Sequence, residues 1–109
     1  MSIFLKKAIL KDNFFIYDLK SSREVKESSI NKKKIELKNH NKWLKNKLAD
    51  KKTLFFIIIE KKYKLKVGYV RLDFENFYYR VTIAVIKSKT RRKYASKALK
   101  LVEKKINLN

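Results

Sequence analysis

The sequence predicts an α+β domain built on a mixed or antiparallel sheet. Three observations support this fold class. Strand-like and helix-like segments follow in the order strand, helix, helix, three strands, helix. The connections between the last three strands are short turns, which join antiparallel neighbours. The 109 residues are 45% hydrophobic and 13% aromatic, which is enough for one domain with a small core.

The first half of the chain predicts one strand and two helices. Ile3–Leu10 reads as a strand, and Asp12 is placed to cap a first helix that Ser21–Arg23 ends. Residues 24–34 are polar, and we expect a loop or irregular helix there. Ile35–Leu48 predicts an amphipathic helix, because a set of mostly apolar side chains falls on one face at helical spacing. That set is Leu37, His40, Trp43, Leu44 and Leu48.

The second half predicts a three-stranded meander followed by a helix. Thr53–Glu60 is apolar on both faces, which is typical of a central strand. Lys66–Phe74 and Phe77–Ile86 are separated by two residues and are expected to form a hairpin. Lys87–Lys93 is a basic loop, and Tyr94–Ile106 has the apolar periodicity of a final helix.

The formal net charge of +20 does not by itself indicate a nucleic-acid-binding protein. Of the 30 basic residues, 25 are Lys and 5 are Arg, whereas base readers depend on the planar fork of Arg. Lys, Ile and Asn together make up 44 residues, the pattern of an AT-rich coding sequence. We therefore interpret most of the charge as solvated surface. A basic nucleic-acid-binding module, with Phe77, Tyr78 and Tyr79 stacking on bases, remains the alternative.

Several classes of protein are not favoured by the composition. The chain has no cysteine, which excludes disulfides and thiolate metal sites. The start of the chain is too short in apolar length for a signal peptide. The longest apolar run, Leu54–Ile59, is far shorter than a membrane span. We expect a cytoplasmic protein without a bound metal.

The unit Val81–Leu101 has the parts that acyl transfer from coenzyme A requires. The pyrophosphate of CoA needs a loop of free backbone N–H groups that leads into a helix N-terminus. Its pantetheine arm carries amides that can pair with a strand edge. Its thioester carbonyl needs an N–H donor for the developing oxyanion. A strand, a short basic loop and a helix in succession can provide all three.

Several segments, taken in order, resemble the GNAT family of acyl-CoA N-acyltransferases. Val81–Val85, the basic loop and Tyr94–Leu99 look like the family's fourth strand, acyl-CoA loop and third helix. His40–Leu44 is similar to the His-x-x-Trp helix of a subgroup that acetylates amino sugars of nucleotide-linked sugars, or ribosomal proteins. The resemblance runs from Ile3 to Lys105, and it is also carried by Leu5–Ala8, Ser22–Lys26 and Val67–Asp73.

The resemblance implies acetyl-CoA as co-substrate and a primary amine as acceptor, on the amino sugar of a nucleotide sugar or on a protein. The acyl donor would bind the fourth strand, the loop and the start of the last helix, at Ile83, Ala84, Val85, Arg91, Arg92, Lys93, Tyr94, Ala95 and Ser96. The acceptor would contact His40, Trp43 and Arg71, and the candidate catalytic bases are Asp73 and Glu75.

Two departures from the family's pattern bear on activity. Arg91 and Lys93 stand where the family has glycines, so we expect restricted φ angles and weakened donor binding. The family's fifth strand and later elements have no counterpart, so we expect residues 1–109 to be a single, partial N-acetyltransferase domain. Phe77–Ile86 would then be an exposed edge through which two copies could pair. A non-catalytic remnant of such an enzyme is the alternative.

Simpler interpretations of the same side chains stay open. His40 is the only histidine, and it fits a packed position on the helix face as well as an acceptor pocket. Trp43 fits the core or a pocket wall. Asp73 fits the polar end of a hairpin, as does Glu75, and Arg71 fits an ion pair with either of them.

Overall fold

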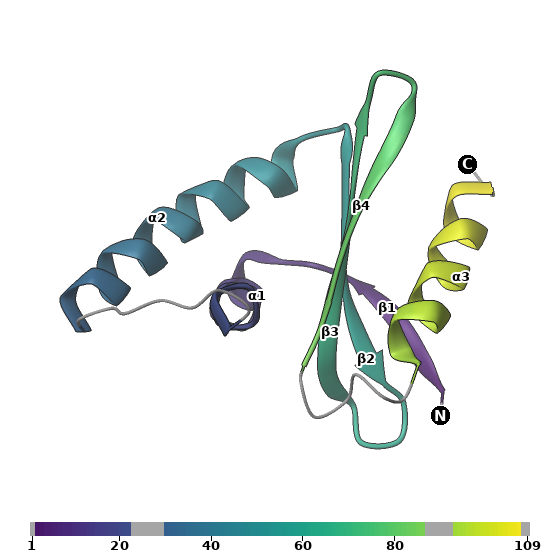
Figure 1. Cartoon of the computed structure of the whole chain (residues 1–109), viewed down its shortest axis with the longest axis horizontal. Coiled ribbons are helices and arrows are strands. Elements are labelled where there is room, and N and C mark those ends of the chain that lie inside the picture. The colour runs from purple at the N-terminus through teal and green to yellow at the C-terminus, as the bar shows by residue number, and fades with distance from the viewer. Residues whose placement is uncertain (1, 23–29, 87–92, 108–109) are drawn as a thin grey trace.

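The computed structural model describes residues 2–22, 30–86 and 93–107. It contains a four-stranded antiparallel sheet in the order β1-β2-β3-β4. Helices α1 and α2 lie on one side of the sheet and α3 lies on the other (Figure 1). The elements are β1 (Ile3–Lys7), the short 3-10 helix η1 (Leu10–Asp12), α1 (Asn13–Ser22), α2 (Ile30–Ala49), β2 (Thr53–Glu60), β3 (Leu65–Glu75), β4 (Tyr78–Val85) and α3 (Tyr94–Asn107).

The predicted α+β class and the antiparallel meander are confirmed. β2 pairs with β1 on one side and with β3 on the other, so it is central, as its apolar sequence predicted. β3 and β4 form the expected hairpin, in which Glu75 pairs with Tyr78. The two turn residues are Asn76 and Phe77, with φ angles of 52° and 71°. Both values lie in the left-handed region, as in the turns that suit two-residue hairpin loops.

The boundaries of the first elements differ from the prediction. The first strand was expected to reach Leu10 but ends at Lys7. Asp12 was expected to cap a helix, and instead its carboxylate accepts the Ile9 N–H at 2.9 Å and binds the Lys66 ammonium at 2.6 Å. These two partners hold Asp12 in η1, which turns the chain out of the sheet before α1 begins.

The ends of the first two helices can be compared with the prediction. α1 ends at Ser22, within the Ser21–Arg23 segment that was expected to end it. α2 begins at Ile30, within the polar stretch where a loop or irregular helix was expected. Residues 30–34 are rich in lysine, which has a good intrinsic helix propensity, and they contain no Gly or Pro that would stop a helix.

The sheet is buried on both faces, so each side carries its own core. Neighbouring β2 residues alternate between them: Ile58 faces α3, whereas Ile57 and Ile59 face α1 and α2. The α3 core contains Ile3, Ile58, Val67, Val70, Leu72, Val85, Tyr94, Ala98 and Val102. The opposite core contains Ala8, Ile16, Leu19, Leu44, Phe55, Ile57, Ile59, Tyr69 and Ala84.

A bulge in β3 lies next to the chain's only glycine. Ile58 pairs with Gly68 and Ile59 with Lys66, so Val67 is an extra residue on β3. The extra residue turns the Val67 side chain into the α3 core. Gly68 lies against β4 so closely that an added Cβ would be 2.3 Å from the Ala84 carbonyl oxygen.

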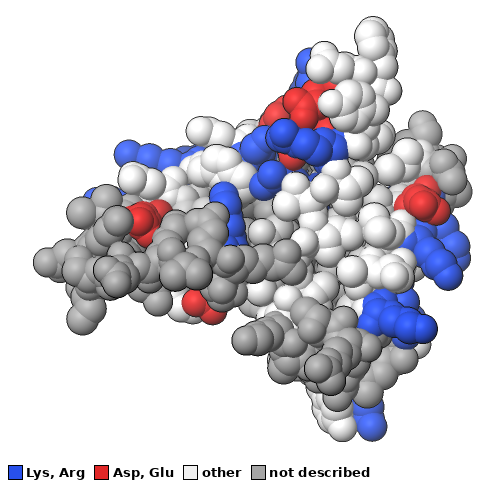
Figure 2. Space-filling model, in the orientation of Figure 1, with Lys and Arg blue, Asp and Glu red and all other residues white. Residues whose placement is uncertain are grey.

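The positive charge is spread over the surface. On the face shown in Figure 2, Lys and Arg side chains form separate groups over several elements instead of one continuous patch. This distribution favours the interpretation of the charge as solvated surface. Within the described ranges, no helix is both long enough and apolar enough to cross a membrane.

Candidate functional site

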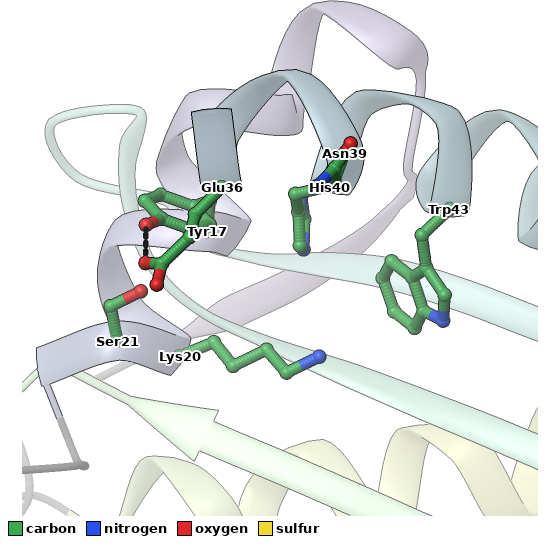
Figure 3. A pocket seen from close by; sticks show the side chains of 7 residues that line it. All are labelled: Tyr17, Lys20, Ser21, Glu36, Asn39, His40 and Trp43. Carbon is green, nitrogen blue, oxygen red and sulfur yellow. Dashed lines mark hydrogen bonds between the residues drawn. The ribbon is translucent and has the colours of Figure 1, made fainter. Parts of the chain in front are cut away.

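A pocket between α1 and α2 gathers polar and aromatic side chains from both helices. Its volume is ≈ 340 Å³, within the range of small-molecule sites. Figure 3 shows the lining residues, which face one another across the space between the two helices. They are Tyr17, Lys20 and Ser21 from α1, and Glu36, Asn39, His40 and Trp43 from α2. Two of the three predicted acceptor-binding residues, His40 and Trp43, are therefore brought together here.

The His40 imidazole is held in one orientation by Asn13. The two side chains are joined by a hydrogen bond of 2.6 Å between His40 Nδ1 and Asn13 Oδ1. Because Asn13 Oδ1 is an acceptor, Nδ1 carries the proton and donates, which leaves a lone pair on Nε2. Nε2 is buried, and no hydrogen-bond partner for it lies among the described residues. The ring thus keeps an acceptor that nothing in the described chain satisfies.

His40 is neutral at physiological pH. Its side chain is buried, and burial is the main cause that lowers its pKa, with the positive charge of Lys20 as the second. Together they lower the pKa of His40 from 6.5 to about 4. A group with so low a pKa is a weak proton acceptor for an alkylammonium, but it is a good hydrogen-bond acceptor. The imidazole therefore suits the binding of a donor group.

The pH dependence of stability is expected to report this shift. The unfolded chain protonates its histidine below about pH 6.5, whereas folded His40 stays neutral until about pH 4. The stabilising effect of neutral burial is therefore present above pH 6.5 and is lost as pH falls toward 4. Between pH 7.5 and 5.5 we expect a loss of roughly 1 kcal/mol in the free energy of unfolding, measured by urea titration. Because the chain has one histidine, His40→Gln should abolish this slope; an unchanged slope would contradict it.

Trp43 is surrounded by aromatic and cationic groups. The Lys20 ammonium lies 4.4 Å from the centre of its ring, and the Arg71 guanidinium carbon lies 5.1 Å from it. The rings of His40 and Phe55 are 4.9 and 6.3 Å away, centre to centre. The ring is therefore a pocket wall that already binds cations through its π face, in agreement with one of the two roles considered for it.

Arg71 supports the pocket from the sheet and is tied to Asp73. Its Nε donates to the Asp73 carboxylate at 2.8 Å, while its guanidinium contacts Trp43 and Phe55. Asp73 also accepts from the Lys47 ammonium at 3.1 Å and from the Thr53 hydroxyl at 3.0 Å. Burial alone would raise the pKa of Asp73, but these hydrogen bonds and the charge of Arg71 outweigh it, so the pKa lies below its usual value.

The two predicted catalytic carboxylates lie outside the α1–α2 pocket, whose own carboxylate is Glu36. The contacts of Asp73 favour a role in fixing Arg71, because a carboxylate with three donors and a lowered pKa is a weak base. Glu75 lies at the end of β3, where it forms a 3.2 Å ion pair with Arg80 on β4. Their assignment as bases stays a prediction.

The predicted donor-binding strand lies at one edge of the sheet. Ile83, Ala84 and Val85 of β4 pair with Val70, Tyr69 and Gly68 of β3 on one side only, because β4 is the last strand in the sheet order. Their side chains pack into the two cores, Ala84 toward α1 and α2, Ile83 and Val85 toward α3. A ligand at this strand would therefore meet backbone at the edge.

The residue before α3 has a left-handed backbone angle, which glycine adopts without strain. Lys93 has a φ of 58°, and its carbonyl accepts the Lys97 N–H at 3.2 Å, so it is the residue that caps the helix. Ala95 and Ser96 are exposed in the first turn, whereas the Tyr94 side chain belongs to the core. The first backbone N–H groups of a helix have no partner within it. Arg91 and Arg92 lie outside the described residues.

Replacing Lys93 by glycine is expected to stabilise the fold. A left-handed conformation is unfavourable for a residue with a Cβ atom, so Lys93→Gly should raise the free energy of unfolding by about 1 kcal/mol. Urea titration measures this change. Lys64→Gly is a second test of the same effect and should be stabilised by a similar amount, because Lys64 is an exposed lysine with a φ of 56° in the β2–β3 turn. A loss of stability in Lys93→Gly would show that the left-handed angle carries no strain.

Some residues of these sites were not predicted. Tyr17 and Lys20 are spaced three apart on α1, and Glu36, His40 and Trp43 recur at helical spacing on α2. That periodicity marks one face of each helix, but it does not say that the two faces meet. Glu60, the last residue of β2, was read as part of an apolar strand; it is buried and accepts a hydrogen bond from the Tyr94 hydroxyl.

The comparison with known proteins is a structural one. The sequence matches no protein-family model and no curated protein. The fold is similar to the F149G mutant of spermidine N-acetyltransferase SpeG from Vibrio cholerae, with a TM-score of 0.69 at 14% identity. That match covers 89% of this chain and 58% of that chain, and the N152L mutant gives the same values.

A second neighbour was solved with acetyl-CoA. It is described as a predicted acetyltransferase from Clostridium acetobutylicum, and it matches with a TM-score of 0.68 and 15% identity over 99% of this chain and 76% of that chain. The neighbours have the GNAT fold, so the predicted fold is confirmed. This chain spans little more than half the length of the Vibrio enzyme.

Proposed function

We propose that this chain binds acyl-CoA and transfers its acetyl group to a primary amine. The observation that carries the proposal is the similarity of nearly the whole chain to a predicted acetyltransferase solved with acetyl-CoA. The other two neighbours are mutants of one enzyme, a spermidine N-acetyltransferase. Identity near 15% leaves the substrate to be argued from the chain's own residues.

The strand, loop and helix at the sheet edge fit the acyl donor. The N–H groups of the first turn of α3 and its dipole favour a pyrophosphate. Lys93 supplies the left-handed turn before this helix, while its side chain stands where the pyrophosphate must approach the backbone. Ile83, Ala84 and Val85 would present the β4 edge to the pantetheine amides. Arg91 and Arg92 are proposed to add charge to the same loop.

The reaction would be a direct displacement. The neutral amine nitrogen attacks the thioester carbonyl carbon, a carbon–nitrogen bond forms, and the carbon–sulfur bond breaks as the CoA thiolate leaves. The proton lost by the amine goes to solvent or to a carboxylate, for which Asp73 and Glu75 were the sequence candidates, and the thiolate takes up a proton. The α1–α2 pocket would hold the acceptor, with His40 and Trp43 in contact with it.

The amine acceptor is proposed to belong to the amino sugar of a nucleotide sugar or to a protein. Because one neighbour is a spermidine N-acetyltransferase, spermidine is a further candidate acceptor. Arg71 would act on the acceptor indirectly, because its guanidinium group packs on the Trp43 ring. Among the described strands, β4 is the last one on its side of the sheet. Its free edge would also allow two copies of the chain to pair.

Titration calorimetry with acetyl-CoA tests donor binding. Lys93→Gly should tighten binding severalfold, because it removes a side chain where the pyrophosphate must approach the backbone. Lys64→Gly relieves a similar backbone angle in another turn and should leave the affinity unchanged. Absence of both heat and thermal shift at millimolar acetyl-CoA would refute donor binding.

Release of free CoA tests turnover. Because the chain has no cysteine, a thiol-reactive dye reports CoA without background from the protein. A nucleotide-linked amino sugar, a ribosomal protein and spermidine are the acceptors to compare. Thiol release that depends on one of them identifies the acceptor class. Tight donor binding without release for any amine would indicate the non-catalytic alternative.

A further inference from the structure

The pocket between α1 and α2 already contains an ammonium group of the chain itself. Lys20 comes from the last turns of α1, and its Nζ lies 4.4 Å from the centre of the Trp43 ring. In Figure 3 its side chain runs beneath His40 toward Trp43, across the pocket. Its charge also acts on the His40 imidazole. One lysine thus lies over the Trp43 ring and acts through its charge on His40, two of the three predicted acceptor-binding residues.

Two other groups of the pocket, on Glu36 and His40, are hydrogen-bond acceptors. Glu36 is a carboxylate with one oxygen, Oε2, at 2.8 Å from the Tyr17 hydroxyl that donates to it. His40 Nε2 is a buried lone pair without a donor among the described residues. A buried acceptor left unsatisfied is costly, so a bound donor would stabilise the site. An alkylammonium offers three N–H donors and a positive charge for the π face of Trp43.

We propose that Lys20 is an internal competitor for a primary ammonium ligand. When Lys20 leaves Trp43, the ligand's ammonium takes its place over the ring and donates a hydrogen bond to His40 Nε2. Nε2 is buried in the present arrangement, so the proposal requires that movement of the lysine side chain opens access to it. Identifying this ligand as the acetyl acceptor rests on the proposed function, but its binding requires no acyl donor.

Competition by Lys20 has a regulatory consequence. The apparent affinity for the ammonium ligand is reduced by the fraction of time that Lys20 occupies Trp43. The side chain of Lys20 is exposed, so a partner carboxylate that holds its ammonium away from the ring would raise acceptor affinity. Loss of its charge would do the same. Lys20 therefore sets how readily the pocket accepts an amine.

Two single residues make the test direct. The chain has one tryptophan and one histidine, and both line this pocket. Fluorescence of Trp43 and the imidazole proton signals of His40 therefore report ligand binding there and nowhere else. The probe is n-butylammonium, and n-butanol is its uncharged counterpart. The variants are Lys20→Met, which keeps the apolar stem, and Lys38→Met, which removes an exposed lysine of α2.

The expected result is selective. Lys20→Met should bind n-butylammonium about fivefold more tightly than the wild type, the effect of removing one competing cation–π contact. Lys38→Met should bind n-butylammonium as the wild type does. The affinity for n-butanol should be the same for the wild type, Lys20→Met and Lys38→Met. Equal or weaker ammonium binding by Lys20→Met would overturn the proposal. An equal gain in Lys38→Met would also overturn it, because net charge alone would then explain the change.

The same variants separate this inference from the proposed function. Lys20 does not belong to the donor-binding strand or helix, so Lys20→Met should bind acetyl-CoA with the affinity of the wild type. Failure of all variants to bind acetyl-CoA would count against the proposed function and leave the ammonium result to decide this inference. Failure of Lys20→Met to bind n-butylammonium at any accessible concentration would reject the inference alone.

Discussion

Gly68→Ala is expected to destabilise the fold by about 3 kcal/mol, near the upper end for overpacking. A Cβ at this position would lie 2.3 Å from the Ala84 carbonyl oxygen and 3.1 Å from the Val85 Cα. Both are backbone atoms of the paired strand, so no side-chain rotation can make room. β4 would have to move away from β3, and the hydrogen bonds between these two strands near Gly68 would weaken.

Urea denaturation measures this loss. Val81→Ala is the control, because Val81 lies on β4 but its side chain is 43% exposed, so its truncation should cost well under 1 kcal/mol. A loss below about 1 kcal/mol in Gly68→Ala would mean that the two strands separate easily. Because β4 carries the proposed pantetheine edge, the same variant should also weaken acetyl-CoA binding.

Tyr94→Phe is expected to cost about 2 kcal/mol, since a hydrogen bond to a carboxyl group is lost inside the core. The Tyr94 hydroxyl donates to the carboxyl group of Glu60, and both side chains are almost fully buried. Phenylalanine fills the same volume, so the change isolates the hydroxyl. The pair joins the first residue of α3 to the last residue of β2. Its loss should therefore loosen the start of α3.

Thermal and urea unfolding measure this effect, and hydrogen exchange of the amides in the second turn of α3, which begins at Lys97, locates it. Tyr63→Phe is the matched control, because Tyr63 is 67% exposed in the β2–β3 turn. Equal stability of Tyr94→Phe and Tyr63→Phe would show that the contact with Glu60 contributes nothing. If global stability is unchanged but hydrogen exchange in α3 is faster, the contact stabilises only the start of α3 and not the whole fold.

The strands and helices could be predicted because their apolar side chains recur at regular spacing. Thr53–Glu60 has apolar residues on both faces, and only a central strand buries both. Element ends were less accurate. Asp12 is typical of a helix cap, but the Lys66 ammonium, 54 residues away, binds its carboxylate and changes its role. A local pattern contains no information about such a distant partner.

The candidate sites also contain some residues that local spacing predicts and others that only distant contacts bring in. His40 and Trp43 were predicted from one helix face, whereas Lys20 and Glu36 became part of the site only when α1 and α2 packed together. The sequence predicted only that a side chain at position 93 would restrict φ; the left-handed angle of Lys93 comes from the structure. The contact between Glu60 and Tyr94 joins residues 34 positions apart, and no spacing rule indicates it.

The hairpin turn has a consequence for the order in which the chain folds. Phe77 has a left-handed φ of 71° and is 97% exposed, so its ring gains little from burial while its backbone is strained. Such a turn does not promote hairpin closure in the unfolded chain, where glycine would. Pairing of β3 with β4 therefore depends on the ladder between the two strands and on the side chains that β4 places in the two cores, more than on the turn that joins them.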